Sequence, residues 1–104
     1  MNERPVNAPA RRIDAAAVPR LKPHVQLQFS APRGQWIVQA PERVLMPDDI
    51  AVAVLKRCSG DASVAAIAEA LALEYGAPRD VVETDVLELL QELVDKGIVT
   101  DARD

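Results

Sequence analysis

Trp36-Ile-Val-Gln-Ala-Pro-Glu-Arg-Val-Leu-Met46 is the stretch that decides the fold. Its two short apolar runs, 36–38 and 44–46, lie on either side of a corner at Pro41-Glu42. β-Branched and aromatic residues favour strands, and proline, which has no backbone donor, belongs at a strand end or in a turn. We therefore predict two adjoining strands, the second only about four residues long. A short strand beside a helical half of the chain is a candidate open sheet edge, which a protein either protects or uses to bind another strand.

A further strand is predicted just before this stretch. Residues 24–29 alternate between polar and apolar types, which places Val25, Leu27 and Phe29 on one face. The turn-forming residues 30–34 then lead into Trp36, so the first two strands should pair as an antiparallel hairpin. Residues 19–23 begin and end with proline and are expected to form an extended lead-in.

Three helices are predicted after Met46. Their starts are indicated by Pro47-Asp48-Asp49, by Asp61-Ala-Ser63 and by the region near Pro78. Each has an apolar stripe at helical spacing. The stripes are Ile50, Val54, Leu55 and Cys58; Val64, Ile67, Ala68, Leu71 and Tyr75; and Val82, Val86, Leu89, Leu90 and Leu93.

The predicted fold class is α+β and winged helix-turn-helix-like, with a three-stranded antiparallel sheet followed by a three-helix unit. Residues 19–100 should form this domain. Residues 1–18 contain few large apolar side chains and are expected to be a flexible arm or linker, and residues 101–104 a disordered tail.

The composition argues against several classes of function. One cysteine and one histidine leave too few ligands for a zinc cluster, so we expect no metal site. Cys58 should be inert core and His24 a surface residue. The scattered carboxylates of the third helix lack an apolar pocket to raise a pKa, and we find no catalytic constellation. The chain is therefore predicted not to be an enzyme. With no long apolar run and no apolar signal core near Met1, we expect a cytoplasmic protein that contacts no membrane.

Charge is distributed unevenly along the chain. Residues 1–60 contain nine Lys and Arg against five Asp and Glu, whereas residues 61–104 contain three against eleven. A DNA-binding winged helix transcriptional regulator is the alternative that this fold suggests, but its recognition helix would normally carry basic and amide side chains. The acidic third helix disfavours that alternative and predicts no nucleic-acid partner.

Several of these pieces, in this order and spacing, resemble the PqqD family of pyrroloquinoline quinone biosynthesis. The resemblance covers about residues 18–99 and is most specific at the Pro41-Glu42 corner and at Asp85-Val86. The other matching pieces are Pro19-Arg-Leu, 25–29, the rest of 36–44, Cys58-Ser-Gly60, Tyr75, Leu89-Leu90 and Lys96-Gly-Ile-Val99.

The resemblance implies a peptide chaperone with the RiPP recognition element fold and no cofactor of its own. Such a protein binds the ribosomal precursor peptide PqqA by strand addition and presents it to the radical S-adenosylmethionine enzyme PqqE. Some members are fused behind PqqC, so the front of this chain is a candidate linker to it. The peptide-binding residues implied are Arg43, Val44, Leu45 and Met46 on the edge strand, and Val82, Asp85, Val86 and Leu89 on the third helix.

Within this set, two charged side chains have suggested roles. Arg43 is expected to pair with an acidic peptide residue, and Asp85 with a peptide donor. The apolar helix residues are equally compatible with ordinary core packing. Self-pairing through the edge strand is a further alternative to peptide binding, although we expect a monomer.

Overall fold

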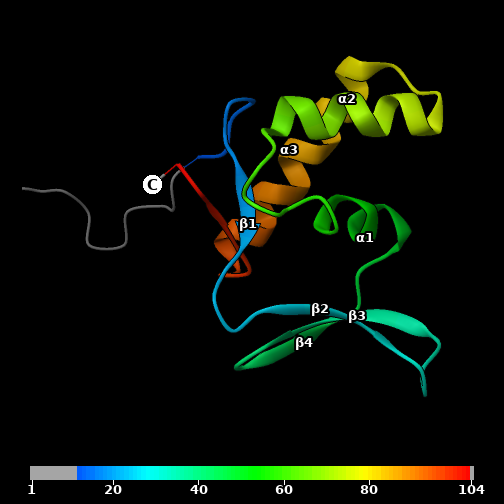
Figure 1. The fold of residues 1–104 in the computed structure, drawn as a ribbon, viewed down its shortest axis with the longest axis vertical. Coiled ribbons are helices and arrows are strands. Elements are labelled where there is room, and N and C mark those ends of the chain that lie inside the picture. The colour runs from blue at the N-terminus through cyan, green and yellow to red at the C-terminus, as the bar shows by residue number, and fades with distance from the viewer. Residues whose placement is uncertain (1–11, 104) are drawn as a thin grey trace, which may run out of the picture.

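The computed structural model describes residues 12–103, so the parts of the predicted arm and tail at residues 1–11 and 104 lie outside the described residues. In Figure 1 a sheet lies at one end of the molecule, α1 lies next to it, and α2 lies at the opposite end. The elements in chain order are β1 (Pro19–Leu21), β2 (Gln26–Ser30), β3 (Gln35–Ala40), β4 (Arg43–Leu45), α1 (Asp49–Leu55), α2 (Val64–Tyr75), α3 (Arg79–Asp95) and β5 (Val99–Asp101).

The predicted three-stranded antiparallel sheet is confirmed, with strand order β2-β3-β4. Leu27 pairs with Val38 and Val38 with Leu45, so these three side chains form one row across the sheet. Val38 at its centre is fully buried. Directly paired residues lie on the same face, so this row defines the face that packs on the helices.

A second sheet joins the two ends of the domain and was not predicted. β1 pairs antiparallel with β5, with Arg20 opposite Thr100. The expected lead-in at 19–23 and the apolar exit at Ile98-Val99 therefore contain strands. The prediction of three strands followed by three helices is wrong in this respect, because strands of only three residues are too short to show an alternating pattern.

The three predicted helices are confirmed, and side-chain caps fix the start of two of them. The Asp48 carboxylate accepts a hydrogen bond from the Ala51 N–H at 2.8 Å, and the Ser63 hydroxyl accepts one from Ala66 at 3.1 Å. The first helix ends at Leu55, one turn earlier than the predicted stripe ending at Cys58. No helix in the described residues is long and apolar enough to cross a membrane.

The core lies between the helices and the inner face of the sheet. It includes Val54, Ile67 and Leu90, each at most 1% exposed. Two predicted stripe residues are exposed: Ile50 is 52% exposed and Tyr75 is 51% exposed. Both lie at a helix end, at the start of α1 and the end of α2, where the neighbouring elements no longer cover the helix.

Residues 12–18 and 101–103 are also packed against the domain, which differs from the predicted arm and tail boundaries. Ile13 is 6% exposed and Ala17 is fully buried. The buried carboxylate of Asp101 accepts a hydrogen bond from the Val18 N–H at 3.0 Å and contacts the Arg103 guanidinium at 2.6 Å. Hydrogen bonding from Arg103 lowers the pKa of Asp101 to about 2. Two buried apolar side chains and one buried carboxylate therefore extend the fold beyond the predicted limits.

Candidate functional site

The edge of the larger sheet is formed by β4. This strand pairs with β3 through Arg43 opposite Ala40, Val44 opposite Gln39 and Leu45 opposite Val38. Among the described residues it has no strand neighbour on its other side. Val44 is 50% exposed and Met46, just after the strand, is 58% exposed. The predicted open edge is therefore present, although Met46 lies outside the strand as the structure bounds it.

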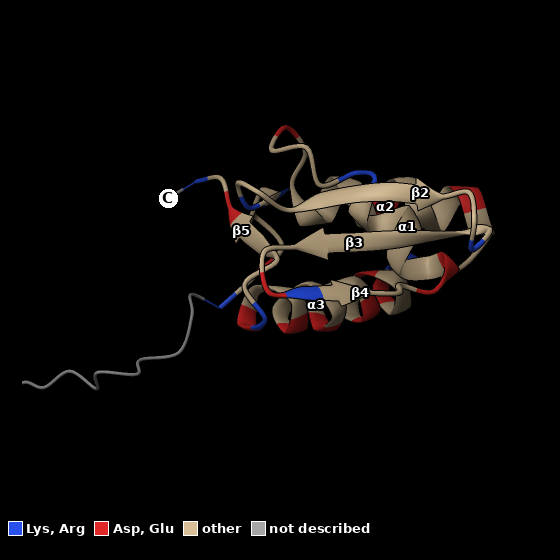
Figure 2. Cartoon of the chain, turned by 90° about the horizontal axis from the view of Figure 1, so that it is seen from below, with Lys and Arg blue, Asp and Glu red and all other residues tan. Residues whose placement is uncertain are grey.

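A groove separates this edge from α3, which lies alongside β4 in Figure 2. It has a volume of about 300 Å³, and its apolar floor includes Leu45 of β4 and Leu89 and Leu93 of α3. Glu92 and Lys96 line the α3 side and form an ion pair at 3.0 Å. The groove therefore has the open edge of β4 on one side and apolar side chains of α3 on the other.

The predicted helix residues do not all face this groove. Leu89 lines it, but Val82, Asp85 and Val86 line a different, more apolar pocket of about 220 Å³ between the three helices. The 17 residues of α3 span about 25 Å, whereas the three residues of β4 span about 10 Å. A strand that short lies beside only part of the helix, and here that part is the C-terminal half.

Three α3 residues that line the groove were absent from the predicted site: Glu92, Leu93 and Lys96. The only sequence signal for them was that Leu93 continues the apolar stripe of α3 one turn beyond Leu89. The periodicity of a helix shows which side chains share a face, but it does not show which turns a neighbouring strand covers.

The two charged residues of the predicted site, Arg43 and Asp85, line two different hollows. Arg43 lies with Lys96 and Gly97 around a shallow hollow at the β3–β4 turn, whereas Asp85 lies in the pocket between the helices. Within residues 12–103, neither Arg43 nor Asp85 has a hydrogen-bond or ion-pair partner through its side chain. Each is available to a ligand, but at opposite ends of the surface.

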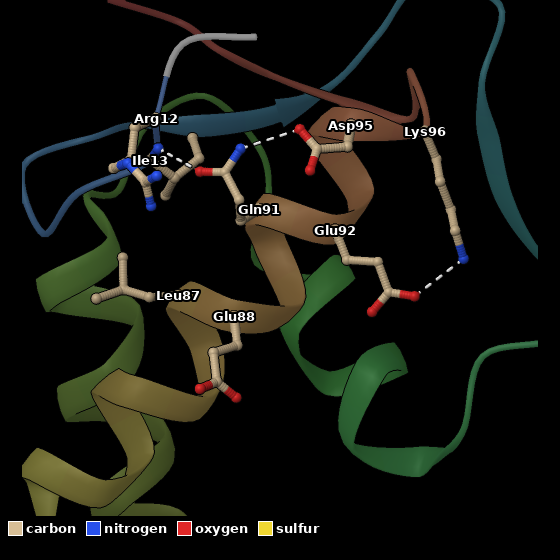
Figure 3. Close-up of a pocket in the computed structure, with 8 residues that line it drawn as sticks. All are labelled: Arg12, Ile13, Leu87, Glu88, Gln91, Glu92, Asp95 and Lys96. Carbon is tan, nitrogen blue, oxygen red and sulfur yellow. Dashed lines mark hydrogen bonds and ion pairs between the residues drawn. The ribbon is translucent and has the colours of Figure 1, made fainter. Parts of the chain in front are cut away.

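Another hollow lies on the opposite side of the Glu92–Lys96 ion pair and is shown in Figure 3. The Ile13 N–H donates to Oε1 of Gln91 at 2.8 Å, and the amide of Gln91 donates to Asp95 at 3.1 Å. The hollow is wide, with a volume of about 560 Å³, and carboxylates line it. The segment before β1 is thus held on the outer side of α3, away from the β4 groove.

Neither the single cysteine nor the single histidine lines the β4 groove. Within the described residues no three His, Cys, Asp or Glu side chains lie close enough to hold a metal ion. Cys58 is buried as predicted, and burial raises the pKa of its thiol to about 12. His24 is exposed, also as predicted. Asp101 has a lowered pKa, but it is the last residue of β5 and its carboxylate contacts the segment before β1.

Two basic side chains near the ends of helices pair with carboxylates. Arg57 pairs with Glu74 at 2.9 Å and Arg79 with Glu83 at 3.2 Å. Figure 2 shows acidic residues along the exposed length of α3. This helix would repel nucleic-acid phosphates, so the structure adds no support for the DNA-binding alternative.

Known proteins resemble the chain over nearly all of this architecture. The family model described as Coenzyme PQQ synthesis protein D (PqqD) matches residues 35–99. A "PqqA binding protein" of Bradyrhizobium diazoefficiens is 46% identical over 92 residues, covering 88% of this chain and 89% of the relative. The solution structure of the PqqD truncation of Methylobacterium extorquens PqqCD, described as a functional and stand-alone RiPP recognition element, has a TM-score of 0.74 and 38% identity. That comparison covers 85% of this chain and 94% of the other. Lasso peptide synthetase B1 complexed with the leader peptide shares the fold, with a TM-score of 0.69, 23% identity and coverage of 81% and 99%.

Proposed function

Because this chain belongs to the PqqD family, we propose that it is a peptide chaperone that binds the precursor peptide PqqA as an added strand on β4. The observation that carries the proposal is the open edge of β4 beside an apolar groove. The name of the Bradyrhizobium relative and the description of the Methylobacterium domain as a RiPP recognition element support the same ligand class. The proposed role is binding and presentation, without catalysis by this chain.

Strand addition would use two kinds of contact. Main-chain groups of 43–45 would hydrogen-bond to the peptide and set its register. Alternate peptide side chains would then enter the groove against Leu45, Leu89 and Leu93, while the others face solvent on the side of Val44. This arrangement explains why an exposed strand lies beside apolar residues of α3.

The charge at the β3–β4 turn adds a directional preference. Arg43 and Lys96 lie together at this end of the groove, and Arg43 has no acidic partner within residues 12–103. An acidic peptide side chain would therefore be favoured at this end, as we predicted for Arg43. Val82, Asp85 and Val86 lie beyond the other end of the groove.

Presentation of the bound peptide to PqqE would use a surface away from the groove. The Methylobacterium domain comes from a PqqCD chain, which supports the proposed association with PqqC. In this chain the segment that leads into β1 lies on the outer side of α3 (Figure 3), so a preceding domain would approach there and leave β4 open. A cytoplasmic monomer remains the expected form.

The peptide loses conformational entropy when it becomes ordered, and the hydrogen bonds of the strand edge and the apolar contacts of the groove must offset this cost. We expect the resulting affinity to be micromolar or tighter. A dissociation constant of 1 µM corresponds to about −8 kcal/mol.

The test is an amide NMR titration with synthetic PqqA, with a short DNA duplex and a PqqA variant that carries proline at the centre of its strand as comparisons. We expect PqqA to shift the amides of 43–46 and 89–96, and proline to abolish most of the affinity, since it removes a main-chain donor. A matched PqqA variant with proline outside the strand should bind normally. Unchanged binding of the central-proline peptide would refute strand addition. Shifts with DNA alone would restore the regulator alternative, and self-association reversed by peptide would show that the same edge also pairs with itself.

A further inference from the structure

The outer face of the three-stranded sheet carries no charged side chain, although 27% of the residues in the chain are charged. Leu27, Val38 and Leu45 form the inner row, so the alternate positions of β2, β3 and β4 point away from the helices. Glutamine, serine, isoleucine and valine occupy these outward positions. The one charged residue of the three strands, Arg43, pairs with Ala40 on the inner side. Figure 2 views the sheet from this side and shows β2 and β3 without a charged residue.

The centre of this outer face offers amide and apolar groups. Gln28 lies opposite Ile37, and its side-chain nitrogen donates to Oε1 of Gln39 at 2.6 Å. Gln39 lies opposite Val44, which is 50% exposed. The cores of protein interfaces are depleted of charged residues, and a glutamine amide can both donate and accept hydrogen bonds. The face therefore suits an uncharged surface of a protein partner.

An added PqqA strand would widen this same face. The strand would lie about 4.8 Å from β4, and its residues opposite Val44 would point outward with Val44. The outward side chains of the peptide and of the sheet would then form one continuous surface. Resting on the proposed function, we infer that PqqE binds the outer face of this sheet together with the outward side chains of the added strand, through an uncharged surface of its own.

The other surfaces near the peptide are less suited to this contact. The groove side of β4 faces α3 and is filled by the peptide in the proposed complex. The outer side of α3 carries Glu88 and Asp95 and holds the segment before β1 through the hydrogen bond from Ile13 to Gln91 (Figure 3). The outer face of the sheet borders the peptide and stays accessible when the groove is occupied.

Two properties of the complex follow from this surface. Because PqqE would contact both the sheet and the peptide, it should bind the complex more tightly than the free chain. By linkage, PqqE would raise the affinity of the chain for PqqA by the same factor. Because charged side chains are absent from the contact, its strength should depend little on salt, whereas a contact through the acidic α3 would be sensitive to salt.

Titration calorimetry of purified PqqE with the chain, both free and saturated with PqqA, measures the contact. The variants are Gln28→Lys and Gln28→Glu, because Gln28 is exposed on β2 and is separated from the peptide edge by β3. Ala70→Lys and Ala70→Glu are the matched controls, because Ala70 is exposed on α2, which lies at the opposite end of the molecule from the sheet (Figure 1).

We expect PqqE to bind the chain saturated with PqqA at least about fivefold more tightly than the free chain. Both Gln28 substitutions should weaken this binding about tenfold, because each places an unpaired charge in an uncharged interface. Neither should change the affinity for PqqA alone, and both Ala70 variants should behave like the wild type. Raising the salt concentration from about 50 mM to about 500 mM should change the affinity for PqqE by less than about threefold.

Equal binding of PqqE by the wild type and both Gln28 variants, or equal binding of PqqE to the free chain and to the complex, would overturn the inference. Opposite effects of Gln28→Lys and Gln28→Glu, or a strong salt dependence, would indicate a charged partner surface and would overturn it too. A sedimentation mass of the chain alone that falls on either Gln28 substitution would assign the face to a second copy of this chain instead. In each of these cases normal binding of PqqA leaves the proposed function intact, whereas failure of the wild type to bind PqqA would remove the proposed function itself.

Discussion

Asp101 gives the clearest prediction about stability, because its carboxylate joins three parts of the chain. It accepts hydrogen bonds from the N–H groups of Val18 and Arg103, both at 3.0 Å, and contacts the Arg103 guanidinium at 2.6 Å. Its side chain is only 2% exposed. Replacing it by asparagine keeps the shape of the side chain but removes the charge. We therefore expect Asp101→Asn to weaken the attachment of both ends of the domain.

The size of the effect follows from the pKa of this carboxyl. Hydrogen bonding from Arg103 lowers it from 3.8 to about 2 in the folded protein. Each pKa unit corresponds to about 1.4 kcal/mol, so the charge contributes roughly 2 kcal/mol to the free energy of unfolding at neutral pH. Because the folded-state pKa lies below the unfolded one, this contribution is fully present above about pH 5 and is lost as the pH falls towards 2. About half of it should be gone at pH 3.

Urea unfolding followed by the fluorescence of Trp36, the single tryptophan, measures this contribution. The free energy of unfolding of Asp101→Asn should lie about 2 kcal/mol below that of the wild type at pH 7, and the difference should shrink between pH 4 and pH 2. Asp61→Asn is the matched control, since Asp61 is exposed and lacks an ion-pair partner among residues 12–103. A difference that stays constant from pH 7 to pH 2.5 would refute the reasoning, because it would show that the charge of Asp101 does not stabilise the fold.

Two further predictions concern Cys58, which is buried, and Gly60, which is partly buried. Cys58, with its pKa raised to about 12, should react with a thiol reagent at pH 8 far more slowly than the same protein unfolded in urea; equal labelling rates would mean that the thiol is accessible. Gly60 has φ +85°, and a Cβ there would lie 3.3 Å from Cδ of Arg20, so Gly60→Ala should lower the free energy of unfolding by about 1–2 kcal/mol. Gly76→Ala, with φ +63° and open space around the added carbon, should cost less in the same urea titration; an equal cost would show that contact with Arg20 is unimportant.

Much of the fold was predictable because local signals are strong in the middle of the chain. Alternation at 25–29, the Pro41-Glu42 corner and the Ser63 cap each indicate one element, and each element is present. The pairing of β1 with β5 had no local signal, since it depends on contacts between distant segments. Ile13 and Ala17 were likewise hidden among small and polar residues, although both are buried.

The candidate site was predictable only in part, for a similar reason. The open edge of β4 follows from the sequence, because a short strand after a proline corner has no further partner nearby. The sequence also predicted which face of α3 lines the site, but it did not predict which turns of the helix do so. Val82, Leu89 and Leu93 share one apolar stripe, and only the packing of β4 against α3 separates the groove from the pocket between the helices.

The pairing of β1 with β5 also has a consequence for folding during synthesis. Arg20 and Thr100 pair across 80 positions of the chain, whereas β2, β3 and β4 are joined by short turns. At ribosomal rates of about 5–20 residues per second, β1 waits roughly 4–16 s before β5 has been made. The sheet that ends at the β4 edge can pair well within that time, because its contacts are local. The two-stranded sheet should therefore close last, after the three-stranded sheet has formed.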